Sequence, residues 1–370
     1  MTAERRVLVV TPPLENRGGV AHYYRSLREH LGPGVEYFGR GGTGEETKLS
    51  GAFRLAGDAR RFRRELERDE IGLVHLNPSF GYKSLFRDCT FLASAKRAGK
   101  RVLVFFRGWD PACARVVRCC LLPWFRRAFF RADWIVVLSA EFERALREMG
   151  YEGPITVETT VVPDSAFDES AGIAGDAPTS AERPANVLFL SRLERGKGLA
   201  TALETHRVLV PRVPGLRLSV AGSGSELESA RRRVRGQGIP GVRFLGYVEG
   251  DAKHAAYRAA DVFLFPTDYG EGMPNAVLEA MAHGLPVVTR SVGGLKDFFE
   301  DERMGYLTDS RDPEVFARLV ESLLSNEAKR AEIGRFNRAY AEQRFKAGAV
   351  ATRLLDIYAR LGFAAASLRP

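Results

Sequence analysis

Two glutamates eight positions apart, Glu271 and Glu279, bracket the start of a predicted helix at 274–283. Glu271 lies in the loop before this helix, near free backbone N–H groups that favour phosphate and other anions. Glu279 lies on the side of the helix, where a carboxylate can accept hydrogen bonds from vicinal hydroxyls such as those of a ribose. Phosphate in the middle and sugars at both ends describe a nucleotide-sugar. In the alternative interpretation, the two glutamates are a turn residue and a helix surface residue.

The elements around these glutamates form a βαβ unit. The apolar runs 261–265 and 285–289 have the length and composition of buried parallel strands. Between them, Pro274 suits the first turn of a helix and Gly284 suits its end. The glutamates are therefore expected at the end of a strand and inside the helix that follows it.

Two cations five positions apart, Arg192 and Lys197, lie in a glycine-bearing loop between a predicted strand at 186–190 and a helix from Leu199. The guanidinium offers a planar fork and the ammonium a compact charge, so both can converge on one pyrophosphate. A solvated basic loop is the alternative.

Glycines follow two other predicted strands. Gly18 and Gly19 open a helix after the strand 6–11, where backbone can approach a ligand or simply make a tight turn. Gly222 and Gly224 supply two glycines of a dinucleotide motif, but Leu227 stands where the third is required. Neither pattern is a complete dinucleotide fingerprint.

A further candidate, Arg107, ends the predicted strand 102–106 and is followed by Asp110. Ligands of α/β sheets bind at the carboxyl ends of strands. Arg107 and Asp110 are therefore candidates for binding donor sugar, phosphate or an anionic acceptor, with a surface loop as the alternative. His75, within the predicted strand 73–76, is expected in the core.

The composition is that of a globular protein with room for two domains: 370 residues, 45% hydrophobic and 10% aromatic. No apolar run is long enough for a transmembrane helix, no signal peptide is evident, and a cytoplasmic location is expected. The four cysteines lack zinc spacing and are expected as free thiols. No cluster of His, Cys or carboxylates has metal-ligand spacing, so no metal site is expected.

The positive charge is concentrated in the first part of the chain. Residues 1–150 hold 27 Lys+Arg and 17 Asp+Glu, whereas the net charge of the whole chain is +9. Lipid headgroups, a pyrophosphate-bearing acceptor or an anionic glycan fit this field, and nucleic acid has no motif to support it. The arginines and aromatic residues of 115–131 suit a peripheral membrane contact or, alternatively, a helix packed on the sheet with snorkelling arginines.

The string at 271–288, EGMPNAVLEAMAHGLPVV, resembles the E-x7-E signature of the retaining glycosyltransferases of family 4. The loop S-R-L-E-R-G-K-G at 191–198 is similar to the diphosphate-binding loop of that family. The resemblance covers nearly all of the second half of the chain and extends only loosely over the first half.

The resemblance implies roles for the candidate residues. Glu271 would hold hydroxyls of the donor sugar, Glu279 those of the ribose, and Arg192 and Lys197 the diphosphate. Arg107 stands where many members of the family have a histidine that reaches the transferred sugar, and we count it with Glu271, Arg192 and Lys197 as a catalytic candidate. The remaining donor contacts are expected from Gly18, Gly19, Gly222, Tyr247, Gly272, Met273, Pro274 and Asn275.

The expected fold is α/β of the GT-B class, with two facing Rossmann-like domains. The predicted domains are an acceptor-binding domain at 1–165, a linker at 166–185, a donor-binding domain at 186–345, and a C-terminal helix at 346–370 that returns to the first domain.

The expected activity is transfer of a hexose or related sugar from a UDP- or GDP-sugar to a hydroxyl of a glycan or lipid-linked acceptor. The resemblance implies retention at the anomeric carbon, and neither a metal nor a cofactor is required. The alternatives are a nucleotide-sugar epimerase of the same architecture and a binding protein without catalysis.

Overall fold

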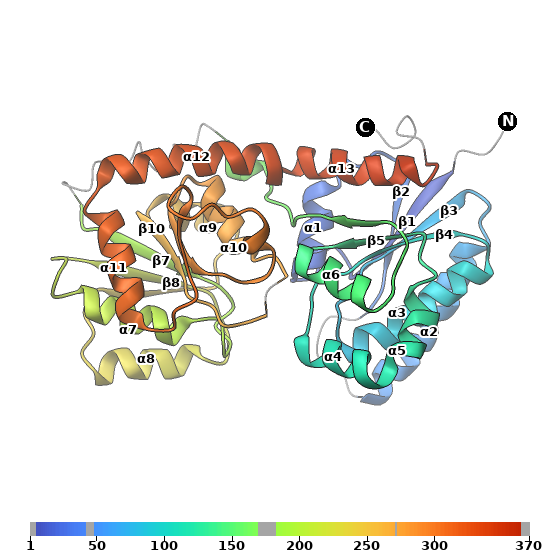
Figure 1. The fold of residues 1–370 in the computed structure, drawn as a ribbon, viewed down its shortest axis with the longest axis horizontal. Coiled ribbons are helices and arrows are strands. Elements are labelled where there is room, and N and C mark those ends of the chain that lie inside the picture. The colour runs from blue at the N-terminus through green and yellow to red at the C-terminus, as the bar shows by residue number, and fades with distance from the viewer. Residues whose placement is uncertain (1–4, 42–47, 169–182, 271, 364–370) are drawn as a thin grey trace. The chain divides into compact units, whose positions relative to one another are not determined.

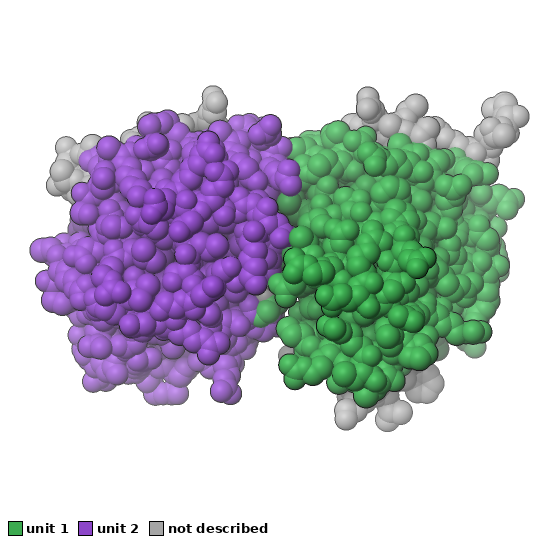
Figure 2. Space-filling view, viewed as in Figure 1, with its two compact units in different colours: residues 1–161, 270–273, 347–370 green, residues 162–269, 274–346 purple. Residues whose placement is uncertain are grey.

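The computed structural model describes residues 5–41, 48–168, 183–270 and 272–363, with the backbone alone described at 48–53. These residues form two compact units, coloured separately in Figure 2. The first unit comprises residues 1–161, 270–273 and 347–370, and the second comprises 162–269 and 274–346. Most of the predicted linker, residues 169–182, lies outside the described part of the chain.

The first unit is built on a six-stranded parallel sheet of order β2-β1-β3-β4-β5-β6 (Figure 1). Its elements are β1 (Arg6–Thr11), α1 (Gly19–Leu27), β2 (Val35–Gly39), α2 (Lys48–Leu66), β3 (Ile71–Leu76), α3 (Tyr82–Arg97), β4 (Arg101–Phe105), α4 (Pro111–Val116), the π-helical turn η1 (Val117–Leu121), α5 (Leu122–Phe129), β5 (Trp134–Val137), α6 (Ala140–Glu148), β6 (Ile155–Val157) and α13 (Ala347–Arg360).

The second unit repeats this plan, with a parallel sheet of order β12-β11-β10-β7-β8-β9. Its elements are the 3-10 turn η2 (Asp164–Phe167), β7 (Asn186–Leu190), α7 (Leu199–Leu209), β8 (Arg217–Ala221), α8 (Leu227–Gly236), β9 (Val242–Gly246), α9 (Gly250–Arg258), β10 (Val262–Phe265), α10 (Asn275–Ala282), β11 (Val287–Arg290), the 3-10 turn η4 (Gly293–Asp297), β12 (Gly305–Thr308), α11 (Pro313–Leu324) and α12 (Glu327–Phe345).

Strand order defines one switch point in each sheet. In the first unit, β1 lies between β2 and β3; in the second, β7 lies between β8 and β10. From each of these central strands the chain first extends the sheet on one side and then crosses over to extend it on the other. Right-handed crossovers therefore place helices on both faces of each sheet. Because every strand is parallel, all carboxyl ends meet at one edge of each sheet, where such folds bind ligands.

Short polar signals fix several helix starts. Ser139 caps α6, its Oγ accepting from the N–H of Phe142 at 3.2 Å, as its position after an apolar strand predicts. Pro123 lies in the first turn of α5, and Asp312 caps α11 by accepting from Glu314 N–H at 3.0 Å. None of the described helices is long and apolar enough to cross a membrane.

The C-terminal helix α13 belongs to the first unit, where it packs on α1. Val350, Leu354 and Tyr358 are buried along its apolar face. Tyr358 Oη lies 2.7 Å from Nδ1 of His75, which is itself fully buried on β3. The last described helix therefore completes the core of the unit in which the chain begins, and His75 is a core residue as predicted.

Candidate functional site

Two loops at the switch point of the second sheet are joined through their backbones. The loop 191–198 follows β7 and the loop 266–274 follows β10. The carbonyl oxygen of Gly196 accepts from Asp268 N–H at 2.8 Å and from Thr267 Oγ1 at 3.2 Å. At Gly198, with φ of 92°, an added Cβ would lie 2.4 Å from the carbonyl oxygen of Pro266. Glycine is therefore required for the close approach of the two loops.

The two predicted diphosphate-binding cations sit differently in this loop. Lys197 is only 5% exposed, and its Nζ lies 3.8 Å from the centroid of the Tyr269 ring, a cation–π contact between the two loops. Arg192 is exposed at the start of the loop. The lysine is thus held in place by protein groups, while the arginine is open to solvent.

A carboxylate ties the same loop to the next strand. Glu194 accepts from the N–H and Oγ of Ser225 at 3.3 and 2.6 Å, and these hydrogen bonds lower the pKa of its carboxyl group. At Gly222, with φ of 136°, a Cβ would lie 1.8 Å from the carbonyl oxygen of Ser191. The partial dinucleotide motif therefore lets β8 pack against the cationic loop. Tyr247, after β9, is 50% exposed.

Glu279 is buried in α10, and its carboxylate accepts hydrogen bonds from side chains of α9. The residue is 5% exposed. Lys253 Nζ donates to Oε1 at 2.7 Å, and Tyr257 Oη donates to Oε2 at 3.0 Å. Each carboxylate oxygen carries a second lone pair that can accept a further hydrogen bond. This environment is that of a fixed acceptor rather than a solvated surface glutamate.

Two histidines extend this polar network and were not predicted. His283 Nδ1 lies 2.7 Å from the carbonyl oxygen of Glu279 and must donate to it, so its Nε2 accepts from His254 Nδ1 at 3.0 Å. Burial lowers the pKa of His283 to about 4. The ring of Tyr257 stacks on His283 with centroids 4.8 Å apart. The two histidines are therefore linked by a hydrogen bond at the end of α10, and His283 is neutral at neutral pH.

The first turn of α10 begins after Pro274, where the helix leaves unpaired backbone N–H groups. Met273 and Pro274 are buried and Asn275 is partly exposed. Glu271 lies outside the described residues. Gly272 groups with the first unit, where an added Cβ would meet Leu138 Cδ1 at 2.9 Å.

In the first unit, Arg107 occupies the carboxyl end of β4. Its Cζ lies 3.9 Å from the centroid of the Tyr23 ring and 4.2 Å from that of Phe105. Nη1 is buried without a hydrogen-bond partner, and burial lowers the pKa of the guanidinium. Asp110 has a local role, because its Oδ1 accepts from the N–H groups of Ala112 and Cys113 at the start of α4.

The glycine pair of this unit lies at the start of α1. Gly18 has φ of 147°, and a Cβ added at Gly18 or Gly19 would have no heavy atom within 4 Å beyond its immediate chain neighbours. These backbone atoms therefore have open space beside them. The pair lies in the loop after β1, the switch-point strand of the first sheet.

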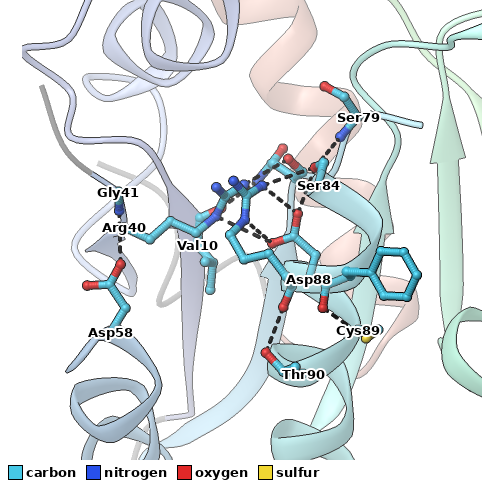
Figure 3. A network of polar contacts seen from close by, with 12 residues as sticks. Val10, Arg40, Gly41, Asp58, Ser79, Ser84, Asp88, Cys89 and Thr90 are labelled. Carbon is cyan, nitrogen blue, oxygen red and sulfur yellow. Dashed lines mark hydrogen bonds and ion pairs between the residues drawn. The ribbon is translucent and has the colours of Figure 1, made fainter. Parts of the chain in front are cut away.

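A buried ion-pair network lies near the ends of β2 and β3, and no sequence pattern indicated it. Figure 3 shows Arg40 and Asp88 directed toward one another; Arg40 Nε lies 3.5 Å from Asp88 Oδ1. Asp88 also accepts from Arg87 at 2.7 Å and from Ser84 Oγ at 3.0 Å. Arg40 and Asp88 are 5% and 0% exposed. Arg40 Nη2 donates to the carbonyl oxygen of Asn77, which follows β3.

The segment 115–131 places Val117, Phe125 and Phe129 in the core and exposes its five arginines. Phe125 and Phe129 are fully buried against one another and Phe106, and Arg127 remains exposed on the same helix. The peripheral membrane contact considered for this segment is not supported by these buried rings. All four cysteines are free, as predicted.

Two parallel, doubly wound sheets with loops gathered at their carboxyl edges place the chain in the GT-B class, and comparison with solved structures confirms this fold. Sucrose-phosphate synthase from Thermosynechococcus elongatus is similar with a TM-score of 0.75 and 18% identity, over 97% of this chain and 99% of that one. Anabaena HepE in complex with UDP-glucose gives a TM-score of 0.73 at 16% identity, over 96% and 99%.

The second half of the sequence is similar to a known family. Residues 176–340 match the family described as "Glycosyl transferases group 1". The phosphatidyl-myo-inositol mannosyltransferase of Mycobacterium leprae is 32% identical over 175 residues, 46% of each chain. Spore coat protein SA of Bacillus subtilis is 29% identical over 180 residues, 46% of this chain and 48% of that one. The matched region spans about half the length of these relatives.

Proposed function

We propose that the protein is a glycosyltransferase that moves a sugar from a nucleotide diphosphate sugar to an acceptor hydroxyl. The observation that carries this proposal is the buried carboxylate of Glu279, fixed by Lys253 and Tyr257 in the helix that follows a switch-point loop. A preset acceptor at this edge suits the two hydroxyls of a ribose. Glu279 also lies within residues 176–340, which match the group 1 glycosyl transferases, and this match supports the same conclusion.

The donor in this proposal is a UDP- or GDP-sugar. Glu279 binds the ribose, and Arg192, Lys197 and the N-terminus of α10 bind the diphosphate. Glu271 and the backbone of 272–275 bind the transferred sugar. Gly222 and Tyr247 lie along the nucleotide side, and Gly18, Gly19 and Arg107 contribute from the first unit. Anabaena HepE, which has the same fold, was solved in complex with UDP-glucose, and this supports the proposed donor class.

We further propose the retaining chemistry of family 4. The acceptor hydroxyl attacks the anomeric carbon on the face that the diphosphate leaves, and the departing phosphate takes the proton from that hydroxyl. Negative charge then grows on the diphosphate, where Arg192, Lys197 and a helix N-terminus stabilise it. These groups are sufficient for departure without a metal ion. The glutamates are not assigned as a glycosidase pair, since they contact opposite ends of the donor.

The acceptor is proposed to be a glycan or a lipid-linked saccharide bound by the first domain, residues 1–165, and the donor to be bound by residues 186–345. The excess of positive charge over residues 1–150 supports an acceptor with anionic groups, at the cytoplasmic face of a membrane in a polysaccharide pathway.

The first experiment is a thermal-shift panel of UDP-, GDP- and ADP-sugars with the wild type, Glu279→Gln and a control, Glu228→Gln. Glu228 is exposed on α8 and far from the switch-point loops in sequence. A ligand that binds only the folded state raises the melting temperature. One base is expected to give a shift in the wild type and control and none in Glu279→Gln. Absence of a shift with every nucleotide-sugar would refute the proposal.

Product analysis then separates the remaining functions. With the selected donor and a panel of acceptors, a new α-glycosidic bond from an α-linked donor establishes retaining transfer. An isomerised donor would identify an epimerase instead. Binding without any product would leave a binding protein.

A further inference from the structure

Arg107 carries a positive charge that no described carboxylate of its unit neutralises. The guanidinium lies between the rings of Tyr23 and Phe105, and its Nη1 makes no hydrogen bond. Among the described residues, no Asp or Glu forms an ion pair with it. Burying a charge without a partner is costly, and such charges are normally paired. The charge is therefore unmatched among the residues that the structure describes.

The groups around Arg107 cannot supply the missing negative charge. Burial raises the pKa of the Tyr23 hydroxyl, which stays neutral. Burial and the charge of Arg107 hold the pKa of His75 well below its usual range, so this imidazole is neutral as well. Two hydrogen bonds, to Tyr358 and Tyr24, occupy the His75 ring.

Backbone hydrogen bonds hold Arg107 at the end of its strand. Arg107 N–H donates to the carbonyl oxygen of Pro78 at 2.8 Å, and Phe80 N–H donates to Gly108 at 2.7 Å. These bonds fix the strand end at the carboxyl edge of the sheet, the edge where ligands bind. Although Nη1 is buried, the residue as a whole keeps an intermediate exposure.

The charges near Arg107 indicate which kind of anion can bind to it. Two other arginines of the unit have carboxylate partners: Arg40 pairs with Asp88 at 3.5 Å, and Arg353 pairs with Glu158 at 2.8 Å. Arg107 contributes a single positive charge, which a singly charged carboxylate neutralises. A phosphate monoester carries nearly two negative charges at neutral pH and would require a second free cation. The planar fork of the guanidinium also matches a carboxylate.

We propose that Arg107 binds the carboxylate of a uronic acid, carried either by the transferred sugar or by the acceptor saccharide. The inference rests on the proposed glycosyltransferase function and narrows its substrates. Both sources present the same chemistry to the guanidinium, a sugar carboxylate beside aromatic faces. Neutral hexoses would leave the charge unmatched, so the site discriminates against them.

The donor arm of the test measures dissociation constants by calorimetry for UDP, UDP-glucose and UDP-glucuronic acid. If the panel selects guanosine, GDP, GDP-mannose and GDP-mannuronic acid replace them. The proteins are the wild type, Arg107→Gln and the control Arg127→Gln, an exposed arginine with the same charge change. The nucleoside diphosphate lacks the sugar, so its unchanged affinity in Arg107→Gln shows an intact fold and donor site. If the wild type binds none of these nucleotides, the proposed function itself is overturned, and this inference with it.

The acceptor arm compares methyl glucuronoside, methyl glucoside and glucose 6-phosphate as acceptors for the donor that the protein uses. We expect a preference of about tenfold or more for the carboxylate compound in one arm, reduced to near unity in Arg107→Gln and kept in Arg127→Gln. Three outcomes would overturn the inference. These are no carboxylate preference in either arm, a preference for phosphate, or a carboxylate preference that survives in Arg107→Gln.

Discussion

Replacing Asp88 by asparagine is expected to destabilise the first unit strongly. Asp88 is fully buried and accepts hydrogen bonds from Arg87 and Ser84 while facing Arg40 at 3.5 Å (Figure 3). Asparagine keeps the shape and removes the charge. Arg87 is 31% exposed and can regain water, but Arg40 is 5% exposed and cannot. The variant therefore leaves the buried guanidinium of Arg40 without the negative charge of Asp88.

The size of the effect follows from the state of Arg40. Burial already lowers its pKa to about 10, even though Asp88 acts in the opposite direction. Removing one partner of a buried ion pair costs about 3–5 kcal/mol. With an m value of about 2 kcal/mol/M in urea, the unfolding midpoint of the first unit falls by roughly 2 M. This is a large share of the ~5–15 kcal/mol that stabilises a typical domain.

Urea unfolding followed by tryptophan fluorescence measures the shift, since all three tryptophans lie in the first unit, at 109, 124 and 134. Glu143→Gln is the matched control, because its partner Arg147 is an exposed neighbour on α6 and such pairs contribute under about 1 kcal/mol. Adding Arg40→Met to Asp88→Asn should recover stability, because it removes the buried guanidinium that has lost its carboxylate partner. A loss below about 1 kcal/mol in Asp88→Asn would refute the reasoning.

Three further predictions concern the second unit. Gly198→Ala forces a Cβ to within 2.4 Å of Pro266 O at a φ of 92°, and should lower stability by about 1–3 kcal/mol and weaken nucleotide-sugar binding, measured by thermal shift and calorimetry. Lys253→Met removes a charged donor from the Glu279 carboxylate, and should raise the dissociation constant for the nucleotide-sugar while Lys329→Met, on α12, does not. The folded-state pKa of His283, about 4, lies below its usual 6.5, so the unfolded chain binds more protons between these values. The contribution of His283 to the free energy of unfolding is fully present above pH 6.5 and falls by on the order of 3 kcal/mol toward pH 4. His283→Gln should flatten this pH dependence in urea titrations. An unchanged profile would assign the acid sensitivity to other groups.

Elements with strong local signals were predictable from the sequence. The strands 6–11 and 186–190 have the predicted bounds, and the predicted helix 274–283 runs over Asn275–Ala282. Buried parallel strands are continuous apolar runs, and a proline or glycine marks the helix limits. The short strand Ile155–Val157 was missed, because three residues carry too little pattern to separate a strand from a loop.

The candidate site was only partly predictable. The cationic loop and Glu279 follow from motifs, but the partners of Glu279 come from α9, 26 and 22 positions earlier in the chain. The pair Arg40 and Asp88 is separated by 48 positions and carries no motif. Such contacts depend on how the sheet orders its strands, which local periodicity does not specify. The unpaired state of Arg107 likewise emerges only once its neighbours are known.

The placement of α13 in the first unit has a consequence for biosynthesis. The second unit is formed by residues 162–269 and 274–346, so it is almost complete once that stretch has left the ribosome. The first unit lacks Tyr358 and the rest of α13 until residues 347–360 have been made, after the whole of the second unit. Domains commonly fold in the order of their synthesis. Here the core of the first unit can be completed only after the second unit has been synthesised.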